Sequence, residues 1–277
     1  MRRPLNMLAA CAAAVLSACA GSTEPVLSYA RQPVVGAYLY AGEPVNDIHL
    51  TWTTTLDASD TIPAPINDAK VSLKRRGVTY SLVKSPGDSG YYRYPGSDLV
   101  VAIGDVFDLE IIVGGQTITA TTTVPRQPGS VTLSADTLKV QTPGPPTPGS
   151  PPQFVEQARV TVRWPATSGA LYYVTVENLE TTLTPIIDTT SFFRVGRGRL
   201  IFPPTAADSF TVNAQSLTYL GRHQVRVFRI NEEYAQLYAS RQQDSRDLNE
   251  PLSNIRGGLG VFSAFASDTA RFVAVRP

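Results

Sequence analysis

The sequence has few cysteines and histidines, the residues on which disulfides and most zinc sites depend. Among its 277 residues are two cysteines, Cys11 and Cys19, and two histidines, His49 and His223. Both cysteines fall in or at the end of the N-terminal apolar stretch, so the rest of the chain has no cysteine with which to form a disulfide. One histidine in each half of the chain is too few for a zinc site. We therefore expect no metal and no cofactor, and a fold that depends on its packed core.

Charged residues and long apolar runs are scarce as well. Charged residues make up 17% of the chain, and the formal net charge is +1. Nucleic-acid-binding domains are usually strongly basic, so no nucleic-acid partner is expected. The N-terminal apolar run covers residues 7–18, which is shorter than the ~20 residues that a helix needs to cross a bilayer. This run is therefore not expected to be a transmembrane anchor.

The N-terminus has the pattern of a secretory signal peptide. Arg2 and Arg3 precede the apolar run, which ends in small residues before Cys19. The sequence Leu-Ser-Ala-Cys at this point resembles the lipobox of bacterial lipoproteins. That resemblance implies removal of residues 1–18 as the signal peptide, acylation of Cys19 and a lipidated tether over residues 19–30. No aspartate follows Cys19, which favours the outer membrane over the inner membrane; a plain secreted protein is the alternative.

The first half of the remaining sequence consists of short alternating segments. Apolar and polar residues alternate with the period of two that marks a half-buried strand. Turns at residues 75–77 and 114–115 separate two pairs of these segments, which predicts two hairpins. Short strands with frequent turns are typical of an antiparallel β-sandwich. The segments are residues 33–40, 47–55, 69–74, 78–83, 106–111 and 116–124.

Part of this half resembles a known type of sandwich. The stretches AKVSLKRRGVTYSLVK, GYYRY and GDVFDLEIIVGGQTITATTTVP are similar to prealbumin-like, carboxypeptidase-regulatory-like domains. The resemblance implies an N-terminal β-sandwich over residues 31–127. Modules of this type are usually structural or binding units.

The second half resembles a fibronectin type III domain. In the stretch ARVTVRW, Val160, Val162 and Trp164 share one face, and Trp164 takes the place of the core tryptophan of that fold. In the stretch HQVRV, His223 stands where the fold usually has a tyrosine, which is a departure from the family pattern. The resemblance implies a second sandwich over residues 128–277.

Two features of the second half are not strands. Residues 141–152, QTPGPPTPGSPP, are expected to form a long extended loop within the second domain, because proline has no N–H for a sheet. Residues 231–244 predict a helix, because Asn231 can cap it, acidic residues follow, and apolar residues recur at i, i+3 and i+4 from Tyr234. The predicted fold class is mainly β, with two antiparallel, Ig-like β-sandwich domains and one short helix inserted near the C-terminus.

The two ends of the chain after the tether resemble a family of exported lipoproteins known only as a domain of unknown function. The resemblance rests on VVGAYLYAGEPVNDIHLTW near the start, and on the helix followed by PLSNIRGGLGVF near the end. This family is typical of Bacteroidota and is often encoded beside a TonB-dependent receptor. The resemblance therefore implies an outer-membrane lipoprotein with such a receptor as a candidate partner, and it implies no catalytic residue.

Three groups of residues are candidates for binding. Tyrosines beside a glycine-rich loop can stack on sugar rings or on a partner, although strand alternation places at least one of them in the core. A basic loop can face lipid phosphates or an anionic polysaccharide, or be a solvated hairpin tip. A glycine-rich segment can form a phosphate-binding loop, or let the backbone pass tightly across the end of a sandwich. The groups are Tyr91, Tyr92 and Tyr94; Arg194, Arg197 and Arg199; and Asn254, Gly257 and Gly258.

The sequence contains no catalytic motif that we recognise. It has neither the His-Glu-x-x-His of metalloproteases nor the Gly-x-Ser-x-Gly of serine hydrolases. Asp108 and Glu110 fall on one face of a predicted strand. This could be a pair of catalytic carboxylates, but a solvated strand face has the same pattern. We therefore expect a non-enzymatic, membrane-anchored lipoprotein that binds a ligand or partner as an accessory to a TonB-dependent transporter. The alternatives are a structural or adhesive surface protein and a polysaccharide or peptide hydrolase.

Overall fold

From residue 31 onward the chain consists largely of β-strands. The expected signal peptide, Cys19 and the tether lie outside the residues described below, as do most of the proline-rich loop and residues 241–244 of the expected helix. The chain divides into two units after Arg31, and residues 32–277 form the second. This computed structural model describes residues 31–54, 62–141, 158–186, 198–240 and 253–277.

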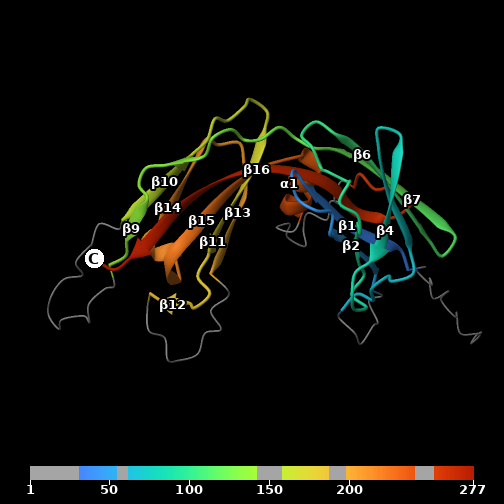
Figure 1. Cartoon of the computed structure of the whole chain (residues 1–277), viewed down its shortest axis with the longest axis horizontal. Coiled ribbons are helices and arrows are strands. Elements are labelled where there is room, and N and C mark those ends of the chain that lie inside the picture. Colours follow the sequence, from blue (N-terminus) through green and yellow to red (C-terminus); the bar gives the residue numbers. More distant parts are fainter. Residues whose placement is uncertain (1–30, 55–61, 142–157, 187–197, 241–252) are drawn as a thin grey trace, which may run out of the picture. The chain divides into compact units, whose positions relative to one another are not determined.

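Thirteen strands of the described segments belong to one large sheet (Figure 1). Eleven of them follow one another across the sheet in the order β13 (Arg199–Thr205), β11 (Leu171–Asn178), β15 (Tyr219–Ile230), β16 (Leu259–Val275), β1 (Pro33–Tyr40), β2 (Asp47–Trp52), β5 (Tyr91–Arg93), β4 (Val78–Lys84), β3 (Lys70–Arg75), β6 (Val106–Val113) and β7 (Gln116–Thr123). The other two are β12 (Thr184–Pro185), which pairs with β15, and β9 (Thr137–Lys139), which pairs with β16.

A small sheet of three strands accompanies the large one in the described residues. In it β10 (Arg159–Arg163) lies between β14 (Ser209–Asn213) and β8 (Thr132–Leu133). A single turn of 3₁₀-helix, η1 (Ala214–Ser216), follows β14, and the α-helix α1 (Glu232–Ser240) follows β15. The fold is thus mainly β, as the composition predicts, with one short α-helix near the C-terminus, as the pattern of residues 231–244 predicts.

The last strand, β16, joins strands that the sequence assigns to two separate domains. Its first part, Leu259–Phe265, pairs in parallel with β1, and its second part, Ala266–Ala274, pairs antiparallel with β15. Because β9 also pairs with it in parallel, the sheet is mixed rather than antiparallel throughout, and it is continuous between the two expected domains. Alternation identifies a strand but says nothing of its neighbour, and β1 and β16 come from opposite ends of the chain.

Buried side chains form three clusters. The first draws on strands β1–β7 and also receives Ile255, Phe262 and Ala264 from the C-terminal segment. The second contains Trp164, which is buried as predicted and packs on Tyr172 with ring centroids 5.6 Å apart. Residues expected in the second domain thus contribute to both of these clusters. The third cluster has a buried centre of Tyr173, Phe228, Ile230 and Phe265.

The local predictions of hairpins and helix are confirmed. β3 and β4 join through a two-residue turn at residues 76–77, and β6 and β7 join through a turn at residues 114–115. α1 begins with two glutamates, whose charge is favourable at the positive end of a helix dipole. Each of these elements depends on residues that are close together in the sequence.

His223 on β15 is a buried polar residue with both ring nitrogens engaged. Nδ1 lies 2.9 Å from the carbonyl oxygen of Gly221, and Nε2 lies 3.3 Å from Nδ2 of Asn178. This network assigns a neutral ring that donates from Nδ1 and accepts at Nε2. The ring also stacks on Phe272 at 9°, with centroids 5.1 Å apart. Burial lowers the pKa of His223 below its ordinary value of 6.5, against the raising effects of the Gly221 carbonyl and Glu180.

Acidification is therefore expected to destabilise the protein through His223. The unfolded chain takes up this proton near pH 6.5 and the folded chain only at lower pH, so the free energy of unfolding falls as the pH drops below 6.5. One proton limits the slope to about 1.4 kcal/mol per pH unit. Urea unfolding between about pH 7.5 and about pH 5 should show this decline, and His223→Gln should make it shallower.

The control for this experiment is Leu138→Ala. Leu138 is a buried apolar residue of the cluster that contains Phe272, so its truncation should lower stability by a similar amount at every pH. A His223→Gln variant with the pH slope of the wild-type protein would show that another group is responsible.

Candidate functional site

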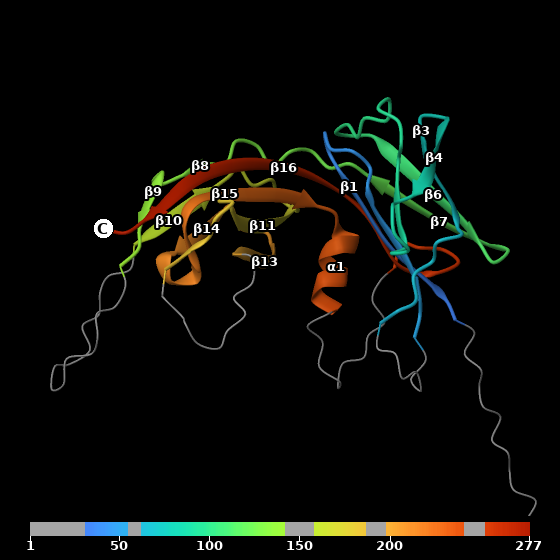
Figure 2. The same ribbon diagram turned by 60° about the horizontal axis from the view of Figure 1, so that its bottom comes forward.

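Beside α1 the surface has a cleft whose walls are mostly tyrosine. Its volume is about 240 Å³. One wall comes from β1 and the start of β2, and the other comes from α1, which lies beside β1 (Figure 2). We call it the aromatic cleft, and it is lined by Tyr38, Tyr40, Asp47, Tyr234, Leu237 and Tyr238.

Alternation along β1 places two tyrosines in this cleft. Ala37 and Leu39 are buried in the first cluster, so Tyr38 and Tyr40 point to the opposite face of the sheet. There both rings contact Phe265 of the neighbouring β16, with centroids 5.9 Å and 5.1 Å away, and the Tyr40 ring is stacked at 19°. Phe265 is buried, so the two tyrosine rings pack on a core residue of the sheet.

α1 supplies the opposite wall. Tyr234 and Tyr238 are one helical turn apart and share a face. The Tyr234 ring meets Tyr38 at 89° with centroids 5.8 Å apart, and it meets Phe265 at 82° and 4.8 Å. Tyr238 contacts Tyr173 of β11 at 6.2 Å. Aromatic pairs of this kind contribute ~0.5–1.5 kcal/mol each beyond their buried area, so ring contacts hold the helix against the sheet.

The start of α1 is also tied to β7. Thr122 Oγ1 donates a hydrogen bond to Glu233 Oε1 over 3.2 Å. Asn231 Nδ2 donates to the carbonyl oxygen of Thr123 over 2.9 Å and to Thr122 Oγ1 over 3.1 Å. Nδ2 of Asn231, the expected N-cap residue, thus binds a neighbouring strand. Tertiary contacts at both the start and the face of α1 therefore set the width of the cleft.

Asp47 is the one carboxylate among the described residues that line the aromatic cleft. Tyr40 Oη donates a hydrogen bond to its Oδ2 over 3.2 Å. Partial burial raises the pKa of Asp47, against the lowering effects of the Tyr40 hydrogen bond and of His49. Burial and the neighbouring carboxylate also raise the pKa of Tyr40, so its phenol stays a neutral donor.

The side chains of the cleft can contribute ring surfaces, hydrogen bonds and charge to a ligand. Four tyrosines offer ring surfaces and phenol groups, and Asp47 adds one negative charge. Most glycosidases need two carboxylates that flank the scissile bond, and the described lining holds one. The cleft can therefore hold a ligand that has apolar or cationic surface and one group that interacts with a carboxylate.

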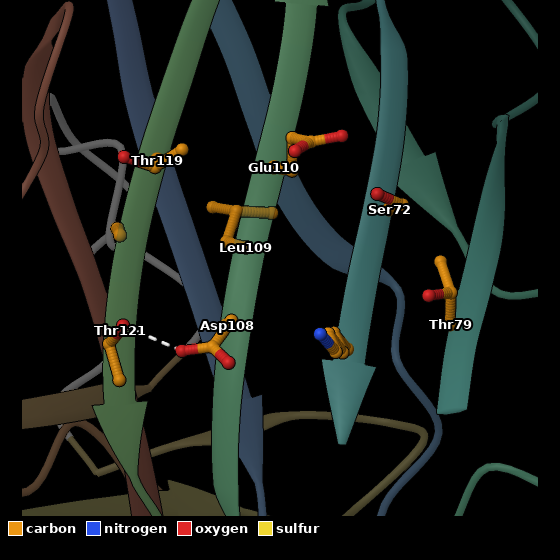
Figure 3. A pocket seen from close by; sticks show the side chains of 9 residues that line it. Ser72, Thr79, Asp108, Leu109, Glu110, Thr119 and Thr121 are labelled. Carbon is orange, nitrogen blue, oxygen red and sulfur yellow. Dashed lines mark hydrogen bonds between the residues drawn. The ribbon is translucent and has the colours of Figure 1, made fainter. Parts of the chain in front are cut away.

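A second depression, of about 300 Å³, lies on the exposed face of β3, β4, β6 and β7 (Figure 3). Asp108 and Glu110 alternate with buried residues along β6, as predicted, and they stand on the solvent side, with Glu110 opposite Ser72 and Asp108 opposite Lys74 of β3 (Figure 3). Asp108 accepts a hydrogen bond from Thr121 Oγ1 over 2.7 Å. None of the described lining residues is aromatic, and the depression has the character of a solvated sheet face.

The three tyrosines predicted as a binding group do not line the aromatic cleft. Tyr92 is 1% exposed and belongs to the first cluster, so it is the core tyrosine that alternation requires. Tyr91 is on the surface and stacks on His49 at 15°, with centroids 4.3 Å apart. Tyr94 Oη donates to Asp98 Oδ1 over 2.7 Å. The three side chains have separate partners and form no common surface.

The glycine-rich C-terminal segment holds strands together. The side chain of Asn254 binds the backbone of Phe262, with Nδ2 2.6 Å from the carbonyl oxygen and Oδ1 2.9 Å from the amide nitrogen. A Cβ on Gly257 would lie 2.6 Å from a β7 carbonyl oxygen, and one on Gly258 would lie 2.9 Å from a β1 carbonyl oxygen. These contacts match the tight backbone passage proposed from the sequence rather than a phosphate-binding loop.

Of the predicted basic loop, only Arg199 is described; Arg194 and Arg197 lie outside the described residues. Arg199 Nε lies 2.9 Å from Glu177 Oε1, an ion pair between β13 and β11. Both side chains are substantially exposed, and such pairs contribute about 0–1 kcal/mol. The anion-binding role of this loop stays a prediction.

Sequence reasoning missed the aromatic cleft, although signals for its parts were present. Tyr38 and Tyr40 lie two residues apart on a predicted strand, and Tyr234 and Tyr238 lie four apart on a predicted helix. Each pair defines a tyrosine face. The pairing of β1 with β16 brings the two faces together, and that pairing is not visible in the local sequence.

Neither a membrane-spanning helix nor a metal-binding cluster occurs among the described residues. None of the helices there has the length and apolar character needed to span a bilayer. The same residues contain no group of three or more histidine, cysteine, aspartate or glutamate side chains placed to hold a metal ion.

Comparison with known proteins identifies a family. No curated protein matches the chain. A solved structure described as "Cytokine receptor complex - Crystal form 1A" is similar at 15% sequence identity and a TM-score of 0.25, over 86% of this chain and 95% of that chain. A TM-score this low supports no argument about function. The family model described as Domain of unknown function (DUF4249) matches residues 23–271. The chain therefore belongs to the DUF4249 family.

Proposed function

We propose that the chain is a non-enzymatic binding lipoprotein of the bacterial outer membrane, held there through lipidated Cys19. The observation that carries the binding role is the aromatic cleft, where four tyrosines and Asp47 surround about 240 Å³. Concave sites with aromatic walls and a few polar groups are typical of ligand-binding proteins. The lipobox-like sequence that ends at Cys19 supports the anchor.

In this proposal the partner is a TonB-dependent outer-membrane receptor, to which the protein is an accessory. Support comes from the resemblance of both ends of the chain to lipoproteins encoded beside such receptors. The finer architecture belongs to the same proposal: a prealbumin-like sandwich over residues 31–127 and a fibronectin type III-like sandwich over residues 128–277, joined by β16. Most of the first cluster comes from residues 31–127 and all of the second from residues 128–277, while Ile255, Phe262 and Ala264 cross the proposed boundary into the first cluster.

Affinity capture tests the proposed function. The tagged, lipidated protein is expressed in its own host, the outer membrane is solubilised in mild detergent, and captured proteins are identified by mass spectrometry. One TonB-dependent receptor in near-stoichiometric amount is the expected result. Recovery of the protein alone from the outer-membrane fraction would exclude the accessory role.

The matched control for the anchor is Cys19→Ala, which has no thiol to acylate. This variant should incorporate no labelled palmitate and should capture no receptor from the membrane. Equal labelling of the variant and the wild-type protein would show that Cys19 is not the lipidated residue.

The edges of the large sheet disfavour the structural or adhesive alternative, because strand addition needs a free edge. At one edge Thr119 of β7 and Arg256 exchange two backbone hydrogen bonds of 3.0 Å and 2.8 Å. At the other edge β13 contains Pro203 and Pro204, which have no N–H to donate. Within the described residues, β7 and β13, the two end strands of the eleven-strand path, are thus obstructed along part of their length.

A further inference from the structure

The chemistry of the aromatic cleft points to one class of ligand. We propose that it binds an organic ammonium ion, a small molecule with a primary amine or a quaternary ammonium group, whose positive end lies against the tyrosine rings and Asp47. The inference rests on the proposed binding function and adds the chemistry of the ligand.

The tyrosine rings stand at steep angles to one another. Of the rings that line the cleft, Tyr38 on β1 and Tyr234 on α1 meet at 89°. Rings at right angles present π faces in more than one direction, which is how aromatic cages recognise quaternary ammonium groups. A cation within about 6 Å of a ring centroid is attracted by ~0.5–2 kcal/mol, and more than one ring lies within reach of this small volume.

Asp47 supplies the opposite charge. Its carboxylate is partly buried, and among the described residues it receives a hydrogen bond from Tyr40 but forms no salt bridge. The neighbouring Glu43 already pairs with Arg226, whose Nη1 lies 2.9 Å from Glu43 Oε1. Asp47 therefore forms no salt bridge with a lysine or arginine of the described residues, although His49 acts on it electrostatically. Burial raises the pKa of Asp47, whereas His49 lowers it. An ammonium ligand would stabilise the partly buried carboxylate charge and so offset the free-energy cost of removing it from water.

The size of the cleft favours a small cationic group. Its volume of about 240 Å³ is below the ~300–1,000 Å³ of sites for drug-sized ligands. An ammonium group on a short chain matches such a volume. A neutral sugar would gain nothing from the negative charge of Asp47, whereas an ammonium ion is attracted by it. Size and charge together favour the ammonium ion.

Calorimetric titration of the detergent-solubilised, lipidated protein with choline tests the proposal. Choline carries a quaternary ammonium group, and 3,3-dimethyl-1-butanol has the same shape with a neutral carbon in place of the nitrogen. The expected result is saturable binding of choline and at least about tenfold weaker binding of the neutral analogue. Equal binding of the two compounds would overturn the proposal, because the positive charge would then contribute nothing.

Substitutions in the cleft separate charge from packing. Asp47→Asn keeps the size of the side chain and removes its charge, so the affinity for choline should fall at least about tenfold. Tyr234→Leu should also weaken binding, whereas Tyr38→Phe keeps the ring and should bind nearly as wild type. Asp108→Asn, on the exposed face of β6, is the matched control and should leave the affinity unchanged. Thermal unfolding of each variant distinguishes lost binding from lost structure.

The outcomes separate this inference from the function on which it rests. Binding of maltose but not of choline, abolished by Tyr234→Leu, would keep the cleft as a ligand site and overturn the ammonium ligand. Capture of the receptor with no binding of choline or of a primary amine such as cadaverine would overturn the inference and keep the accessory role. Binding of choline without capture of a receptor would support the inference and exclude the accessory role.

Discussion

Replacement of Gly260 by alanine is expected to lower the free energy of unfolding by about 3 kcal/mol or more. Gly260 lies opposite Val35 in the parallel pairing of β16 with β1, and its φ is +110°. A side chain at this φ is strained. A Cβ would also lie 2.8 Å from the backbone nitrogen of Val35 and closer still to its carbonyl oxygen. Because both partners are backbone, the clash is relieved only if β1 and β16 separate.

The matched control is Gly42→Ala. Gly42 follows β1 and has a φ of +78°, but a Cβ there would meet no atom within 4 Å. Gly42→Ala should therefore lower the free energy of unfolding by only about 1 kcal/mol, because alanine is unfavourable in this backbone conformation. Urea unfolding of both variants measures the difference. Equal costs for the two substitutions would contradict the close approach of β16 to β1.

Replacement of Asp105 by alanine is the second change with a large expected effect, about 2–3 kcal/mol of lost stability. The Asp105 side chain is 1% exposed and lies 3.2 Å from Arg75 Nη1 and 2.6 Å from Arg76 Nη2. Arg75 in turn donates to the carbonyl oxygen of Val100 and to Tyr80 Oη. Loss of the carboxylate leaves a mostly buried guanidinium without its counter-charge. The expected loss of stability is smaller than for a fully buried ion pair, because Arg76 is largely exposed.

Asp108→Ala is the matched control for Asp105→Ala. Asp108 lies on the solvent side of β6, the strand that begins directly after Asp105, with Thr121 as its hydrogen-bond partner, so its loss should cost less than about 1 kcal/mol. The double variant Arg75→Met/Asp105→Ala should lose less stability than the two single changes added together, because no buried charge is then left unpaired. Additive losses in this cycle, measured by urea unfolding, would show that the pair does not interact.

Part of the fold follows from residues that are close together in the sequence. The hairpins β3–β4 and β6–β7 form because alternating segments flank a two-residue turn, and both the turn and the alternation are local. The burial of Tyr92 follows from the same alternation, as does the solvent exposure of Asp108 and Glu110. The position of α1 follows from its acidic start and its apolar spacing.

The candidate site was harder to predict because residue type does not reveal the partner. Asn254, Gly257 and Gly258 have the composition of a binding loop, but they bind other strands of the same chain. Tyr38 and Asp47 could not be identified as site residues from the sequence. Tyrosine is common in strands, and a lone aspartate is common where a strand begins. Tyr38 and Asp47 become a site only opposite Tyr234.

The sequence by itself determined the strand-rich class, the hairpins, the helix and the lipobox-like start, because each is specified within a short stretch of chain. Only the tertiary structure decided that β16 pairs with β1 along its first part and with β15 along its second part. The same pairings make the sheet mixed. The tertiary structure also decided that α1 lies against the tyrosine face of β1. The reason is physical: alternation specifies which face of a strand is buried, whereas strand partners and helix docking depend on the packing of buried side chains far apart in sequence.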